Sequence, residues 1–200
     1  MPRRYMSIGR GAKNPSRHPG MNFRFTPLLG VIGVHVLLYA RPGSDKVLAG
    51  DAIQARATAA ALRNMGIQAD LAEGVPFPDP APYDLVHLFN LMPVETTHAA
   101  FRAARAAGKP VALATIFWDP AEFLDVWDRD GAFAGWWART NRLRREVLAG
   151  VRVILPNSGA ELDCLRRAFG ADLPPHVIVP NGVDVSLFHP GLRAALPRVD

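Results

Sequence analysis

Polar side chains follow most of the long apolar runs of this sequence at short distances. They are Asn90, Trp118, Asp119, Asn157, Ser158 and the stretch 181–184, and Gly50 and Asp51 add to them at the start of a helical pattern. Amides and carboxylates of this kind bind hydroxyl groups and orient ligands. If the apolar runs are parallel strands, their carboxyl ends share one edge of a sheet, where open α/β folds bind ligands. We therefore expect a binding site along that edge.

The elements that would position these residues alternate along the chain. Apolar runs predict strands at 34–40, 67–72, 83–89, 110–117, 151–156 and 176–180. Helical patterns between them predict helices at 51–65, 94–107, 132–149 and 158–169. The strands read as continuous apolar runs, which indicates that both faces are covered. Alternating strands and helices predict an α/β fold with a doubly wound, Rossmann-like parallel sheet.

The helix 51–65 has clear expected ends. Asp51 suits its N-cap and Gly66 its C-terminal stop. Residues at helical spacing predict its buried face as Ile53, Ala57, Ala60, Ala61 and Met65. The free backbone N–H groups at Gly50–Asp51 favour an anion, although a plain loop with an Asp cap explains the same residues equally well.

Two familiar cofactor patterns are not supported. Gly43 and Gly50 lie seven residues apart, whereas a nicotinamide-binding turn needs G-x-G-x-x-G between strand and helix. Asp128-Arg129-Asp130 spells the D-x-D of some metal-dependent sugar transferases, but it lies in an acidic stretch typical of a solvated helical face. The six histidines lack metal-ligand spacing. We expect no metal site and no cofactor.

Two helices carry motifs with structural explanations. Ser158-x-x-Glu161 is a capping box, which satisfies free N–H groups at a helix start without any ligand. The helix 132–149 combines tryptophans with arginines 139, 142, 144 and 145. Such a helix can contact an anionic membrane, and a core-packing helix with an arginine outer face is the alternative that we favour.

Charge and cysteine content limit the partners and the compartment. Residues 1–24 carry six of the 23 basic residues and no acid, which leaves 17 basic residues against 18 acids in the remainder. A basic tail on a near-neutral body is not the distributed patch that nucleic-acid binding needs, so we expect no nucleic-acid partner. The single cysteine, Cys164, fits a reducing, cytoplasmic compartment. We expect a disordered tail at 1–24, one domain at 25–190 and the start of a linker at 191–200.

In order along the chain, four segments resemble the N-terminal half of family 4 glycosyltransferases with the GT-B fold, which are retaining, nucleotide-sugar-dependent enzymes. They are "AGDAIQARATAAALRNMGIQADL", "YDLVHLFN", "VRVILPNSGAELDCL" and "VPNGVDVSLFHP". The last is similar to a recurring P-N-G-V-D-x-x-x-F-x-P pattern. The similarity spans roughly residues 33–190.

The resemblance implies a function and a set of site residues. This half of the family binds the acceptor, so it implies substrate-binding roles for Gly50, Asp51, Gln54, Asn90, Trp118, Asn157, Ser158, Glu161, Asn181, Gly182 and Asp184. Many members carry a histidine after the fourth strand, where this chain has Phe117-Trp118-Asp119, so Asp119 is the catalytic candidate. Transfer to a sugar or lipid-linked acceptor would need a nucleotide-sugar donor, held in a C-terminal domain beyond residue 200.

Two other functions are also compatible with the sequence. One is a non-catalytic module of the same fold that binds a glycan or another acceptor. The other is an unrelated Rossmann-like enzyme that uses a nucleotide.

Overall fold

The computed structural model describes residues 33–43, 49–120, 124 and 126–182. These residues form the α/β fold with a doubly wound parallel sheet that the alternating runs predict. The strands are β1 (His35–Ala40), β2 (Gln68–Glu73), β3 (Leu85–Phe89), β4 (Val111–Ala114) and β5 (Val153–Ile154). All neighbours pair in parallel, in the order β2-β1-β3-β4-β5.

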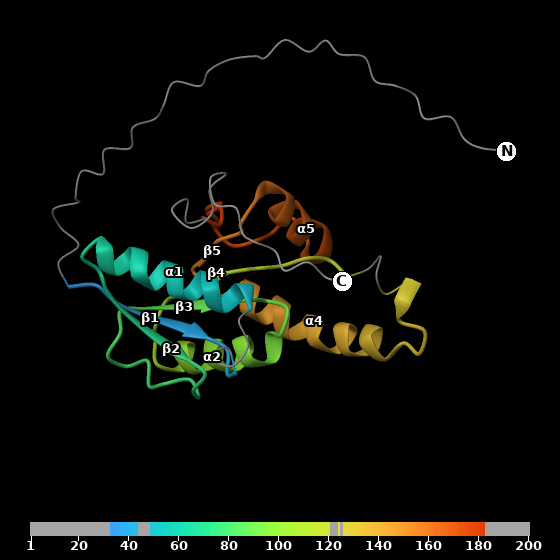
Figure 1. Ribbon diagram of the computed structural model, residues 1–200. Coiled ribbons are helices and arrows are strands. Elements are labelled where there is room, and N and C mark those ends of the chain that lie inside the picture. The colour runs from blue at the N-terminus through green and yellow to red at the C-terminus, as the bar shows by residue number, and fades with distance from the viewer. Residues whose placement is uncertain (1–32, 44–48, 121–123, 125, 183–200) are drawn as a thin grey trace, which may run out of the picture.

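Helices cover the sheet unevenly (Figure 1). The described helices are α1 (Gly50–Asn64), α2 (Val94–Ala106), α4 (Ala132–Gly150) and α5 (Gly159–Phe169). Residues of α2, α4 and α5 share one core with the β1, β3 and β4 side chains that face them, among them Phe101, Leu113 and Leu165. The opposite face has a smaller core in which Ala55 and Ala59 of α1 pack on Val36 and Leu38. Among the described helices, α1 alone contributes residues to that second core.

The sixth predicted strand is reduced to a single bridge. His176 pairs in parallel with Ile154, and the N–H groups of Val177 and Val179 donate to the carbonyls of Ile154 and Pro156. The chain therefore runs beside β5, but β5 itself has only two residues, so no longer ladder forms. Val177 and Val179 stay 57% and 43% exposed at this edge.

The predicted buried face of α1 is wrong. Ala52, Ala55 and Ala59 are buried, whereas Ile53 is 50% exposed and Met65 59% exposed. Alanines occur on both sides of this helix, so spacing alone did not distinguish the face that packs on the sheet. One apolar side of α1 is consequently exposed among the residues that the structure describes.

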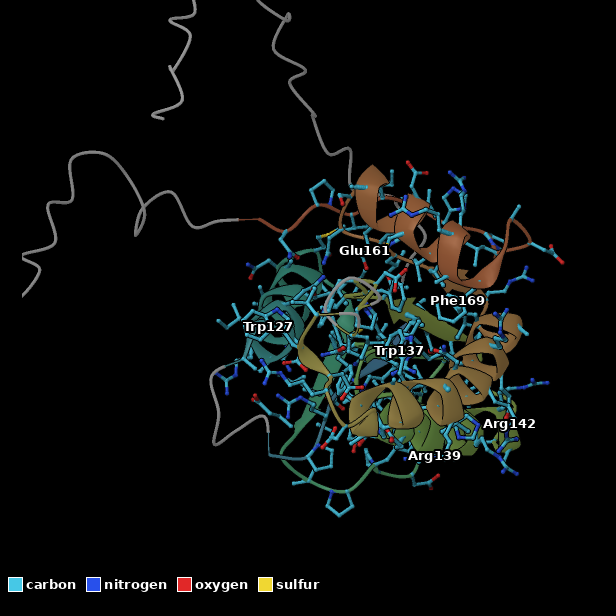
Figure 2. The ribbon with its side chains drawn as sticks, turned by 90° about the vertical axis from the view of Figure 1, so that its right-hand side faces the viewer. Trp127, Trp137, Arg139, Arg142, Glu161 and Phe169 are labelled. Atoms are coloured by element: carbon cyan, nitrogen blue, oxygen red, sulfur yellow. The ribbon has the colours of Figure 1, made fainter. Side chains whose placement is uncertain are left out.

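α4 packs into the core, which is the arrangement that we favoured over a membrane-contacting helix. Trp137, Val147 and Leu148 are buried, while Arg139 and Arg142 project outward from the helix (Figure 2). Arg144 departs from the expected outer face because it is fully buried. It donates to the backbone carbonyls of Leu91 and Met92 and lies over the ring of Trp137.

Within the described residues, no helix combines the length and apolar character needed to cross a membrane.

Candidate functional site

α1 begins at the carboxyl edge of the sheet, but Asp51 does not cap it as predicted. The helix starts at Gly50, its N-cap is Ala49, and no side chain caps it. Asp51 thus lies in the first turn and is buried at 5% exposure. One carboxylate oxygen, Oδ1, accepts from Ala52 N at 3.0 Å within the first turn of α1, whereas Oδ2 is directed to groups outside the helix.

The Asp51 carboxylate joins the loops that follow β1 and β3. Its Oδ2 accepts hydrogen bonds from Arg41 Nε at 2.8 Å and from Asn90 Nδ2 at 3.0 Å. Burial opposes ionisation of Asp51, but the hydrogen bonds from Asn90 and Arg41 outweigh it, and the pKa lies below its ordinary value. An ionised carboxylate therefore stands where the chain crosses from one side of β1 to the other, the switch point at which such folds bind ligands.

A second contact extends this polar edge toward β5. Gln54, one turn along α1, donates from Nε2 to Asn157 Oδ1 at 3.0 Å. Both residues were predicted as substrate-binding, and both are partly buried. Through Asp51 and Gln54, the start of α1 therefore contacts residues that follow β1, β3 and β5.

Glu161, near the start of α5 (Figure 2), holds the loops after β4 and β5 together. One carboxylate oxygen accepts from the Thr115 hydroxyl and from Phe117 N at 2.8 Å, and the other accepts from Asn157 N at 2.7 Å. The predicted capping box is half correct. Ser158 is the N-cap and its Oγ accepts from Glu161 N, but the reciprocal bond goes to Asn157 instead of Ser158. Glu161 is thus occupied by structural bonds.

The loop after β4 contains a strained residue. Ile116 has a φ of +44°, which is rare for a β-branched side chain and often marks functional segments. It ends the strand at Ala114, earlier than the predicted 117. The loop then carries Trp118, 51% exposed, and Asp119, which is also exposed.

Four of the predicted residues line one cavity. Gly50 and Gln54 of α1 face Asn181 and Gly182 across a space of about 440 Å³. Trp118 and Asp119 are not among the residues that line this cavity. Asp184 lies outside the described residues.

The D-x-D sequence has a structural role. Asp128 accepts hydrogen bonds from the backbone N–H groups of Phe133 and Ala134, and Asp130 accepts one from Ala132. These carboxylates satisfy donors at the start of α4. The residues that the structure describes contain no cluster of three or more histidine, cysteine or acidic side chains able to hold a metal ion.

Sequence reasoning missed two members of this edge. Arg41 directly follows β1 and pairs with Asp51, and its position after a strand was the signal that could have found it. Thr115, fully buried, follows β4 and donates to Glu161, but it was counted within a longer strand. The edge as a whole offers an ionised carboxylate, a guanidinium and several amides, which suits hydrogen bonding to a ligand rich in hydroxyl groups.

Comparison with known proteins adds no identification. No family model matches this chain, and no curated protein matches it significantly. The assignment of function therefore rests on the residues themselves.

Proposed function

We propose that this chain is the acceptor-binding half of a glycosyltransferase that moves a sugar from a nucleotide-sugar to a glycan or lipid-type acceptor. The observation that carries the proposal is the polar edge around α1. There Asp51 bonds with Asn90, and Gln54 bonds with Asn157. These are four of the residues to which the family resemblance gives acceptor roles.

The chemistry of this edge supports a sugar acceptor. Neutral amides and an ionised carboxylate can exchange hydrogen bonds with hydroxyl groups at little cost, because each hydroxyl both donates and accepts. A phosphate-rich ligand is less suited, because the negative Asp51 already stands in the first turn of α1 and accepts from Ala52 N there. This favours an acceptor over a dinucleotide at the same position.

Donor binding belongs, in this proposal, to a further domain with which the chain would act. Catalysis depends on holding donor and acceptor in register, so we expect this chain to transfer no sugar without that domain. Asp119, exposed after β4, remains the proposed catalytic candidate. We place the enzyme in the cytoplasm, in keeping with the free, buried Cys164.

Binding measurements on the chain of residues 1–200 test the proposal. We expect ligand-observed NMR to detect a mono- or disaccharide from a neutral sugar panel, and Gln54→Ala to weaken it about tenfold. Gln68→Ala, at the exposed edge strand β2, is the matched control and should bind normally. Binding of NAD⁺ together with no binding of any sugar would overturn the proposal and favour an unrelated nucleotide enzyme.

Transfer assays separate an enzyme from a binding module. Once the chain is joined to its donor-binding domain, a labelled nucleotide-sugar should label the acceptor that the panel identifies. Sugar binding without transfer in that complete protein would instead indicate a non-catalytic module of the same fold.

A further inference from the structure

An apolar trough runs along α1 on the thinly covered face of the sheet. Two cavities compose it, of about 440 Å³ and 330 Å³. Both are lined by Gln54, Thr58 and Val179, so they meet along the same side of the helix. From Gly50 to Leu62 the helix rises about 18 Å, which sets the length of the trough.

The wall of the trough is the apolar side of α1 that the sequence placed in the core. Ile53, Ala57 and Ala61 line the first cavity at helical spacing and are all exposed. The opposite wall is the segment 179–182 beside β5. None of the described residues covers this face of α1, and a contiguous exposed apolar face of a helix marks a binding surface.

The floor of the trough is hollow because its side chains are small. Ala112 and Ala114 of β4 face this side of the sheet, where larger residues would fill the space. His87 of β3 lies beside them, and burial lowers its pKa from 6.5 to about 4, so it is neutral at physiological pH. The described lining of the second cavity thus carries no charge near neutral pH.

The trough is continuous with the polar edge. Gly50 and Gln54 line the first cavity, and Gln54 also bonds with Asn157 of the candidate site. Polar groups lie at the start of α1 and apolar ones further along it. A ligand that occupies both parts must have a hydroxyl-bearing head and an apolar tail.

We propose that the trough along α1 seats the alkyl or isoprenyl chain of a lipid-linked acceptor whose sugar head lies at the Asp51–Gln54 edge. The head-group part of this inference rests on the proposed function, whereas the tail part does not. Continuity with the edge favours this occupant, because Gly50 and Gln54 line the first cavity of the trough beside Asp51, where the head would bind.

A series of alkyl glucosides tests the tail site. Methyl, butyl, hexyl and octyl β-glucoside are titrated below their micelle concentrations into the chain of residues 1–200. Because the four ligands share the same glucose head, any difference in their affinity comes from the alkyl chain. We expect affinity to rise by up to about fourfold per added methylene until the trough is filled.

Matched variants test whether the gain in affinity with alkyl chain length arises in the trough. Ala57→Trp fills the trough and should abolish the dependence of affinity on the length of the alkyl chain. Ala60→Trp, exposed on α1 and outside both cavities, should leave that dependence unchanged. Ala61→Trp serves as the second trough variant if Ala57→Trp loses its helical circular dichroism.

The outcomes separate the two proposals. Equal affinity for methyl and octyl glucoside overturns the tail site while leaving sugar binding intact, and it is also the result expected if a segment of this chain fills the trough. A chain-length dependence that Ala57→Trp and Ala61→Trp leave unchanged overturns it as well. Binding of octanol without any sugar binding supports the tail site and removes the support for a glycosyltransferase.

Discussion

The side-chain amide of Asn90 donates a hydrogen bond of 3.0 Å to the Asp51 carboxylate, 39 residues away in the sequence. Asn90 itself has a φ of +72°, a left-handed conformation that asparagine tolerates better than most residues. Its Oδ1 accepts from Met92 N at the same time. Asn90 therefore fixes the loop after β3 and the start of α1 in one arrangement.

Replacing Asp51 tests the strength of this arrangement. Asp51→Ala leaves the Asn90 amide and the Arg41 guanidinium without their acceptor, which should lower the free energy of unfolding by about 1–3 kcal/mol. Urea denaturation followed by circular dichroism measures the change. Asp163→Ala, at an exposed ion pair on α5, is the control and should change stability by less than about 0.5 kcal/mol. Equal effects of the two variants would contradict the structural role of Asp51.

Buried His87 predicts a loss of stability in acid. Burial lowers its pKa in the folded chain from 6.5 to about 4. Between these values the unfolded chain binds one more proton, so stability falls as the pH decreases, at up to about 1.4 kcal/mol per pH unit. The contribution is complete above about pH 6.5 and is lost by about pH 4.

Substitution isolates the His87 contribution from that of the carboxylates. His87→Leu should flatten the pH dependence of the unfolding free energy between pH 4 and 6.5. The exposed His176→Gln should retain the wild-type slope. An unchanged slope in His87→Leu would show that His87 is accessible to protons in the folded chain.

Arg144 should be intolerant of lysine although the charge is kept. Its guanidinium donates to Leu91 O, Met92 O and the Thr140 hydroxyl, and lies 3.8 Å from the Trp137 ring centroid. A lysine ammonium lacks the planar fork that reaches these acceptors together. We expect Arg144→Lys to cost about 2–3 kcal/mol of stability and to change Trp137 fluorescence. Arg142→Lys, exposed on the same helix, should do neither, and similar unfolding midpoints for both variants would refute this role.

The sequence predicted the sheet well because its strands are continuous apolar runs that few other folds accommodate. β1 and β3 lie within two residues of their predicted bounds. α1 was predicted with the wrong buried face because Ala57 and Ala60 are as apolar as Ala55 and Ala59. Composition could not show which side of an alanine-rich helix meets the sheet.

The polar edge of the sheet was predictable in its position, but the hydrogen bonds between its residues were not. Strand ends indicated Asn90 and Asn157, whereas their partners Asp51 and Gln54 are 39 and 103 residues away. Such pairings depend on the three-dimensional arrangement of the loops, which spacing along the chain does not encode. Glu161 illustrates the same limit, since its capping motif gave no sign of the bonds to Thr115 and Phe117.

Glu161 provides the last prediction, because its two oxygens accept three hydrogen bonds from two loops. Glu161→Gln keeps the shape but turns an NH₂ group toward at least one donor, so a backbone N–H or the Thr115 hydroxyl loses its acceptor. We expect the unfolding free energy to fall by about 1–3 kcal/mol, and amide hydrogen exchange to rise at Phe117 and Asn157. Asp163→Asn, two residues along α5, should alter neither measurement. Unchanged exchange at both amides, together with weaker sugar binding, would instead make Glu161 a direct ligand contact.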